Sequence, residues 1–376
     1  MNIKRHGAAT VGIVAAGALL LAACGSNNNT GSGGSSSGPS GSQVNVACGG
    51  KQNLTGEGST AQKAAMDEFI AAYGQKCSGQ QFAYNATGSG AGVKQFTGAK
   101  VDIGGSDSPL DPTKGEPAAA AKRCGGNPAW DIPMVFGPVA VSYKLSGVTD
   151  LTLTPDVTAK IFSGAIKTWN DPAIKKINPS ANLPSTPITV IYRSDQSGTT
   201  DNFQKYLGAA APSSWTKGAG KTFAGGVGEG KEKSAGVADA LSTAEGSIGY
   251  IEWSYAQSKK LSVAKIDSGA GPVALSTDSV SKAIDSVQVK AGSAPNDLVL
   301  DTKALYASKA AGVYPLVLGT YEIVCSKGYD ADTAKAVKAF LTVAATDGQQ
   351  NLTQDGYVPL PTSFQTKVLA AINAIS

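Results

Sequence analysis

The stretch RSDQSGT combines an arginine, an aspartate, three hydroxyl side chains and a glycine within seven residues. The guanidinium of Arg193 can donate two parallel hydrogen bonds to an oxyanion, and Asp195 can hold that fork in place. Ser197, Gly198 and Thr199 add hydroxyl groups and the backbone N–H groups of a helix start, where negative charge is favoured. This stretch therefore predicts an anion-binding site.

Three earlier turns, GEGSTA, TGSGAG and GGSDSP, have the same small and polar character. We expect Ser59, Thr60 and the N–H groups after them, beginning with Ala61, to cap a helix and face a ligand. Glycines around Ser89 let the backbone approach an anion closely. Asp107 is a carboxylate beside an anion site, which is unfavourable unless the anion carries a proton.

Each of these turns lies between an apolar strand and a helical pattern. A strand near Leu54 precedes the first turn, and Met66, Phe69, Ile70 and Tyr73 follow it at helical spacing. Strands that alternate with helices predict parallel sheets covered on both faces. Ligands of such sheets lie at the carboxyl ends of the strands, so the four turns are expected to meet there.

The same alternation continues along the chain. A second strand runs through FAYNA, a third passes through Val101 and Ile103, and a long β segment covers DIPMVFGPVAVSYKL. PITVIY, GSIGYIEWSYAQ and YPLVLGTYEIVC predict further strands, and DADTAKAVKAFLTVAA predicts a late helix.

Two nucleotide motifs are only partly matched. Gly56 to Ala61 fits G-x-G-x-x-A, but the next strand offers Asn85 where a dinucleotide site needs an acidic residue. Gly220-Lys221-Thr222 supplies the tail of a P-loop, but Trp215 stands where its first glycine is needed. Neither motif predicts a nucleotide cofactor.

Charge and histidine content exclude several function classes. Charged residues make up 16% of the chain, its formal net charge is +4, and no basic cluster is present, so nucleic acid is not an expected partner. The single histidine is His6. A chain that lacks histidine beyond its leader cannot use Ser-His-Asp or Cys-His catalysis or the commonest zinc sites. We expect no enzyme activity, no metal and no cofactor.

The N-terminus predicts export and a membrane anchor. Lys4 and Arg5 precede an apolar run over residues 11–23, which is typical of a signal peptide over residues 1–23. Its end, LAAC, resembles the bacterial lipobox, in which the cysteine, here Cys24, is acylated. Residues 24–43 are rich in glycine and serine and predict a flexible tether. The protein is expected on the extracytoplasmic face of the cell membrane.

The four turns, in this order, resemble those of the PstS-type phosphate-binding proteins of bacterial ABC transporters. LTGEGSTAQ, TGSGAGVKQF, DIGGSDSPL, KTWNDP followed by RSDQSGT, and GSIGYIEWSYA carry the resemblance, which extends over residues 54–361. It implies an α/β fold of the periplasmic binding protein type II-like class. Two lobes, residues 44–136 with 314–376 and residues 137–313, would be joined by crossing strands, with the ligand cleft between them.

The resemblance also implies a ligand, partners and contacts. The ligand would be inorganic phosphate, and the partners would be the transmembrane permease and the ATPase subunits of a phosphate ABC transporter. The family contacts fall on Thr60, Ala61, Ser89, Asp107, Arg193, Ser197, Gly198 and Thr199, with Ser59 as a further hydroxyl donor and Asp195 orienting the arginine. Ala61 departs from relatives that have an aromatic residue at this position.

Asp107 then has a physical role. Phosphate near neutral pH carries a proton that it can donate to this carboxylate, whereas sulfate has none and would be repelled. Two alternatives stay open: a binder of another tetrahedral oxyanion such as arsenate, and a secreted phosphatase.

Cys48, Cys77, Cys124 and Cys325 remain after the lipobox cysteine and suggest two disulfides in an exported protein. Cys48 and Cys77 precede two strands that are expected to be neighbours in a parallel sheet, which favours a Cys48–Cys77 bridge and leaves Cys124–Cys325.

Overall fold

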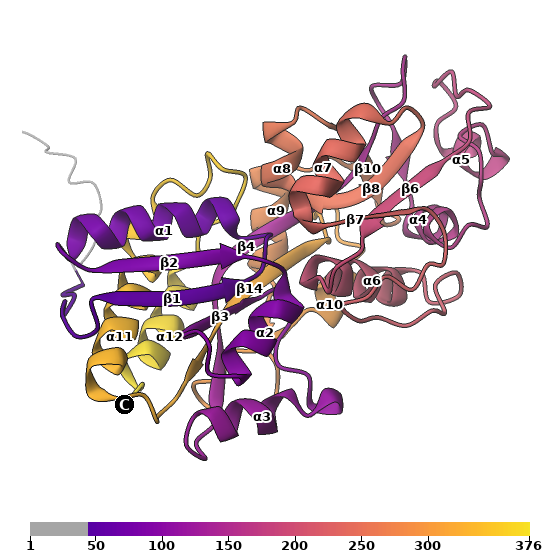
Figure 1. Ribbon diagram of the computed structural model, residues 1–376. Coiled ribbons are helices and arrows are strands. Elements are labelled where there is room, and N and C mark those ends of the chain that lie inside the picture. Colours follow the sequence, from indigo (N-terminus) through magenta and orange to yellow (C-terminus); the bar gives the residue numbers. More distant parts are fainter. Residues whose placement is uncertain (1–43) are drawn as a thin grey trace, which may run out of the picture. The chain divides into compact units, whose positions relative to one another are not determined.

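The computed structural model describes residues 44–376, so the predicted leader, Cys24 and the tether over residues 24–43 lie outside the described residues (Figure 1). The first third of the described chain consists of β1 (Asn53–Gly58), α1 (Lys63–Lys76), β2 (Gln81–Ala86), α2 (Ser89–Thr97), β3 (Ile103–Ser106), η1 (Pro112–Lys114), α3 (Glu116–Arg123) and β4 (Ala129–Tyr143).

Shorter elements make up the middle: β5 (Thr152–Leu153), α4 (Pro155–Phe162), α5 (Pro172–Ile177), β6 (Thr189–Arg193), α6 (Gly198–Ala210), β7 (Glu229–Lys231), α7 (Lys233–Thr243), β8 (Ser247–Glu252), α8 (Trp253–Ser258), β9 (Ser262–Val263), β10 (Lys265–Asp267) and β11 (Pro272–Val273). The remaining elements are α9 (Thr277–Ile284), β12 (Gln288–Val289), β13 (Leu300–Asp301), α10 (Lys303–Tyr306), β14 (Val317–Cys325), α11 (Ala331–Ala345), η2 (Asp347–Gln349) and α12 (Thr362–Asn373).

The described residues build a nine-stranded mixed sheet in the order β2-β1-β3-β14-β4-β8-β6-β7, with β9 beside β4. β1 pairs in parallel with β2 and β3, and β6 pairs in parallel with β7 and β8. β14 and β4 run antiparallel to each other in the middle of the sheet. Parallel pairing around the predicted turns is therefore confirmed, and two antiparallel strands separate the two parallel groups.

β4 is shared by two halves of the sheet. Residues 129–138 of β4 pair with β14, whereas residues 139–143 pair with β8. We call β2, β1, β3, β14 and the start of β4 the first half-sheet, and the end of β4 with β8, β6, β7 and β9 the second half-sheet. The long β segment predicted from DIPMVFGPVAVSYKL is thus the strand that joins them, as Figure 1 shows.

Helices pack on both faces of each half-sheet. Successive strand residues point to opposite faces, and apolar side chains on both faces need helices to cover them. On β14, Val324 belongs to the main core with α1, α11 and α12, while Ile323 and Cys325 pack with α2 and α3 in a second core. On α1, Met66, Phe69 and Tyr73 are buried as their spacing predicted. No helix within residues 44–376 is long and apolar enough to cross a membrane.

Two predicted boundaries are wrong by a few residues. The third strand begins at Ile103 rather than Val101, and the Asp102 carboxylate before it accepts hydrogen bonds from the Thr55 N–H and hydroxyl groups. GSIGYIEWSYAQ is a strand only as far as Glu252, and its second half is α8.

Both predicted disulfides, Cys48–Cys77 and Cys124–Cys325, are present, each with a Cα–Cα distance of 5.4 Å. The first joins the chain before β1 to the end of α1, next to the paired starts of β1 and β2. The second joins the end of α3 to the end of β14, and it closes a loop with a sequence separation of 201 residues.

Candidate functional site

The four predicted turns meet where the first half-sheet faces the second. The turns after β1, β2 and β3 come from the first half-sheet, and the turn after β6 comes from the second. Across this junction the Gly90 N–H donates to the Gln196 carbonyl at 3.0 Å, and the hydroxyl groups of Thr60 and Ser234 lie 2.7 Å apart. All the predicted contact residues are buried here: Ser59, Thr60, Ala61, Ser89, Asp107, Arg193, Ser197, Gly198 and Thr199.

The Asp107 carboxylate is the centre of a set of hydroxyl groups. Its Oδ1 accepts from Ser59 Oγ at 2.5 Å and from Thr320 Oγ1 at 2.8 Å, and its Oδ2 accepts from Ser89 Oγ at 3.0 Å. Burial raises the pKa of Asp107 to about 6, although the three hydroxyl contacts oppose that shift. A carboxylate with this pKa is largely ionised at neutral pH and can accept a proton from a ligand.

Arg193 supplies positive charge to the site and is almost fully buried. Its Nε and Nη2 atoms donate to Asp195 Oδ1 and Oδ2 at 2.8 and 2.5 Å, and its Nη1 donates to Ser234 Oγ at 3.1 Å. Burial alone would raise the pKa of Asp195, but the paired contact with Arg193 lowers it below its usual value. Asp195 therefore holds the guanidinium, as the sequence predicted, and stays ionised.

The start of α6 presents its N-terminus to the same place. Ser197 caps the helix by accepting a hydrogen bond from the Thr200 N–H group at 3.2 Å, and Gly198 is the first helical residue. The Thr199 hydroxyl donates to the Glu252 carboxylate. Backbone N–H groups at such a helix start attract anions.

Gly198 lies close to the turns of the first half-sheet. A Cβ atom there would lie 2.6 Å from both Asp107 Cβ and Ser89 Oγ. Gly198→Ala is therefore expected to push the turns apart and weaken anion binding by about tenfold or more, measured by titration calorimetry. The control is Gly208→Ala on the same helix, where the nearest described atom is Trp215 Cδ1 at 4.0 Å. Equal affinities of the two variants would contradict the expectation.

The first turn differs in one respect from the prediction. α1 begins at Lys63, and within the described residues no side chain caps it. The expected helix cap at Ser59 and Thr60 is therefore wrong. Ser59 Oγ instead accepts from the Ala61 N–H group at 3.0 Å and closes a tight turn, while it donates to Asp107.

Sequence reasoning missed three polar side chains at the site. Ser234, at the start of α7, contacts both Thr60 and Arg193. Thr320 reaches Asp107 from the interior of β14, and Glu252 receives the Thr199 hydroxyl from the end of β8. Glu252 alone had a local signal, since it is a charged residue that ends an apolar strand.

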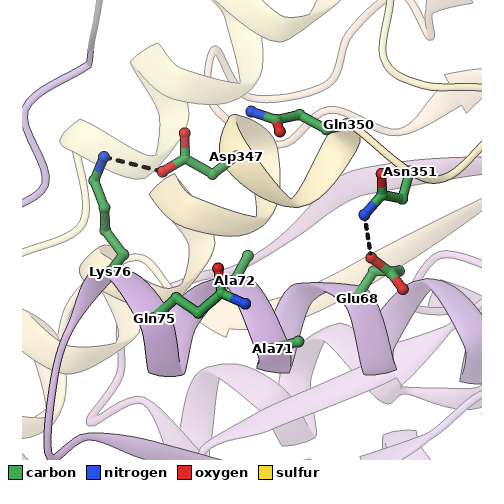
Figure 2. Close-up of a pocket in the computed structure, with 8 residues that line it drawn as sticks. All are labelled: Glu68, Ala71, Ala72, Gln75, Lys76, Asp347, Gln350 and Asn351. Atoms are coloured by element: carbon green, nitrogen blue, oxygen red, sulfur yellow. Dashed lines mark hydrogen bonds and ion pairs between the residues drawn. The ribbon is translucent and has the colours of Figure 1, made fainter. Parts of the chain in front are cut away.

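A surface hollow lies outside this junction, between α1 and the segment after α11 (Figure 2). It has a volume of about 300 Å³, and its one cation, Lys76, is paired with Asp347 at 3.1 Å. Glu68 also lines it and accepts from Asn351 at 2.9 Å. This hollow therefore contains two carboxylates and one lysine that is already paired, so its charge does not favour the binding of an anion. No three His, Cys, Asp or Glu side chains within residues 44–376 are grouped to hold a metal ion.

The fold and the enclosed polar site define a solute-binding protein of the periplasmic binding protein class. Residues 30–347 match the PBP superfamily domain. A solved structure of a high-affinity periplasmic phosphate-binding protein (PfluDING) with phosphate superposes with a TM-score of 0.66 at 26% identity, covering 85% of this chain and 93% of the other.

Sequence relatives narrow the class further. The chain is 52% identical over 378 residues to phosphate-binding protein PstS2 of Mycobacterium bovis, with both chains fully covered. It is 31% identical over 324 residues to phosphate-binding protein PstS of Pasteurella multocida, covering 85% of this chain and 89% of that protein. The chain therefore belongs to the PstS family of phosphate-binding proteins, and the predicted family and fold class are confirmed.

Proposed function

We propose that this protein binds inorganic phosphate outside the cytoplasm and delivers it to an ABC transporter. The observation that carries the proposal is the meeting of Arg193, the N-terminus of α6 and the hydroxyl groups of the first two turns near Asp107 in the third. Donors of this kind suit a tetrahedral oxyanion, and the PstS relatives are phosphate-binding proteins by name.

The proposed contacts are those of the four turns. The proposed donors to phosphate oxygens, through hydroxyl, backbone or guanidinium groups, are Thr60, Ala61, Ser89, Arg193, Ser197, Gly198 and Thr199, with Ser59 as a further donor. To donate to phosphate, the hydroxyl groups of Ser59, Ser89 and Thr199 turn away from the carboxylates of Asp107 and Glu252. Asp107 accepts the phosphate proton, and Asp195 orients Arg193. Sulfate carries no proton at neutral pH, so it would place an unprotonated oxygen against an ionised carboxylate.

The ligand is proposed to lie between two lobes, residues 44–136 with 314–376 and residues 137–313. The pairing of β4 with β14 in one part and with β8 in the other supports this division. So do the hydrogen bonds between turns of the two half-sheets. A crystal structure grown with phosphate tests both points, and an ion bound away from these turns would contradict them.

Titration calorimetry tests the function itself. Phosphate is expected to bind tightly, and sulfate weakly or not at all. Arsenate, which also carries a proton, decides the alternative of a different tetrahedral oxyanion. Incubation with p-nitrophenyl phosphate decides the alternative of a secreted phosphatase: we expect no release of nitrophenol, because the mature sequence contains no histidine and we propose that the protein is not an enzyme.

We further propose that Cys24 carries a lipid and that the protein acts on the extracytoplasmic face of the membrane, where the permease and ATPase subunits of the transporter would receive the phosphate. Cys24→Ala is expected to leave the protein unprocessed or to release it from the membrane fraction. Detergent phase partition and mass spectrometry of the N-terminus measure both outcomes. A variant that stays in the membrane and is trimmed normally would contradict the anchor.

A further inference from the structure

A second buried carboxyl group lies next to the proposed phosphate site. Glu322 on β14 is 0% exposed, and neither of its carboxyl oxygens has a hydrogen-bond partner among residues 44–376. Thr320, two residues earlier on the same strand, donates to Asp107. A buried, ionised and unpartnered carboxylate is strongly unfavourable, so such a group retains a proton instead.

A chain of polar contacts runs from Asp107 to Gln62. Ser59 Oγ donates to Asp107 at 2.5 Å, Tyr84 Oη donates to the Ser59 carbonyl at 2.9 Å, and Gln62 Nε2 donates to Tyr84 Oη at 3.0 Å. The Gln62 side chain lies beside Gly105, the residue that pairs with Glu322 across the sheet. The Gln62 Oε1 atom is buried and has no partner within the described residues.

Gly105 makes room for this arrangement. It pairs with Glu322 across β3 and β14. A Cβ atom at Gly105 would lie 2.3 Å from Tyr84 Oη and 2.5 Å from Gln62 Nε2, so these two side chains occupy the space beside the glycine. A protonated Glu322 has a hydrogen to donate, and Gln62 Oε1 is a buried acceptor that lacks a partner within the described residues.

Burial and the charge of Asp107 favour the neutral form of Glu322. Burial, and next the negative charge of Asp107, raise the pKa of Glu322 to about 8, although Gln62 opposes the shift. Tyr84 faces it from β2, and burial raises the pKa of Tyr84 well above its usual value, with Glu322, Asp107 and Glu57 as further causes. Tyr84 therefore stays neutral. These groups supply no positive charge to stabilise an ionised Glu322.

We propose that Glu322 is a proton-holding positioning residue of the phosphate site, whose neutral carboxyl group supports the chain of contacts from Gln62 to Asp107 and whose ionisation weakens phosphate binding. The inference rests on the proposed function. Below about pH 7 the Glu322 carboxyl group is neutral with or without bound phosphate, so Glu322 adds no pH dependence to the phosphate affinity. Above about pH 8 the free protein carries an extra negative charge there, and bound phosphate must either face that charge or draw in a proton.

Calorimetric titration with inorganic phosphate between about pH 6.5 and pH 9.5 tests this, using the whole domain. The wild type is compared with Glu322→Gln, whose amide can donate to Gln62 at every pH. The ionisation of phosphate and of Asp107 affects both proteins, so the ratio of their dissociation constants isolates Glu322. This ratio, wild type over variant, is expected to rise by on the order of tenfold across the range. Glu245→Gln, an exposed position, is the matched control and should follow the wild type.

Glu322→Met separates charge from hydrogen bonding and serves if the glutamine variant does not fold. It removes the titrating group and leaves Gln62 Oε1 without a donor, so we expect the pH profile of Glu322→Gln with a lower affinity. Parallel profiles of the wild type and a Glu322 variant would overturn this inference alone. Absence of phosphate binding by all the proteins would overturn the proposed function and this inference with it.

Discussion

Replacing Arg193 with alanine is expected to weaken phosphate binding by about two to three powers of ten. The guanidinium side chain is 2% exposed and is held by a two-pronged contact with Asp195. Its loss removes the positive charge of the site and leaves the Asp195 carboxylate, 17% exposed, facing the anion without its partner. Truncating one member of a buried charge pair costs roughly 2–5 kcal/mol, which corresponds to the stated loss.

Calorimetry with phosphate at about pH 7.5 measures this effect, and a thermal melt of the ligand-free protein shows whether the variant is folded. Arg193→Lys is the informative comparison, because it keeps the charge but cannot form the fork to Asp195. A second comparison is the double variant Arg193→Ala with Asp195→Ala, which should recover part of the affinity because the unpaired carboxylate is gone. A loss below tenfold in the folded Arg193→Ala variant would show that phosphate binds elsewhere.

The turns of the site could be predicted because each has a complete local signal. An apolar strand, a short run of glycine and hydroxyl residues and a helical pattern follow one another at Ser59, at Ser89 and at Ser197. Parallel strands present their carboxyl ends at the same edge, so the local signals also predict that the turns meet. The structure shows that meeting in the contacts among Ser59, Ser89 and Asp107.

The groups that were missed depend on pairings between distant parts of the chain. Thr320 reaches Asp107 only because β14 inserts between β3 and β4, more than 200 residues after β3 along the sequence. Within YPLVLGTYEIVC, Thr320 has no neighbours in sequence that mark it as a polar partner of a binding site, and the charge of Glu322 does not say which groups it faces. Their roles follow from register, and register in a sheet is set by the whole packed structure.

The helix cap expected at Ser59 failed for a related reason. A hydroxyl followed by a helical pattern is the usual signal for an N-cap. Here the carboxylate of Asp107 competes for the same hydroxyl, and the Ala61 N–H group donates to Ser59 Oγ two residues before α1 begins. The sequence signal marked a residue that is important to the site, but it could not show which partner the hydroxyl would take.

Replacing Asp107 with asparagine is expected to narrow the preference for phosphate over sulfate by about one to two powers of ten. An amide keeps one oxygen that can accept a hydrogen bond from the phosphate O–H group, so phosphate affinity falls only modestly. The negative charge that repels sulfate is removed, so sulfate affinity rises. An unfavourable buried contact of this kind costs roughly 1–3 kcal/mol. Its removal in the variant should therefore reduce the preference for phosphate over sulfate by the stated amount.

Competition calorimetry with both anions at about pH 7.5 measures the preference, since Asp107, with a pKa of about 6, is then ionised in the wild type. Asp195→Asn is the matched control: it removes a charge of the same sign, but at the carboxylate that holds Arg193, so it should weaken phosphate and sulfate together. If Asp107→Asn discriminates as sharply as the wild type, the proton of phosphate is not read by Asp107. Selectivity would then have to come from the hydroxyl and N–H donors alone. Phosphate and sulfate oxygens accept hydrogen bonds from such donors in the same way, so these donors do not by themselves separate the two anions.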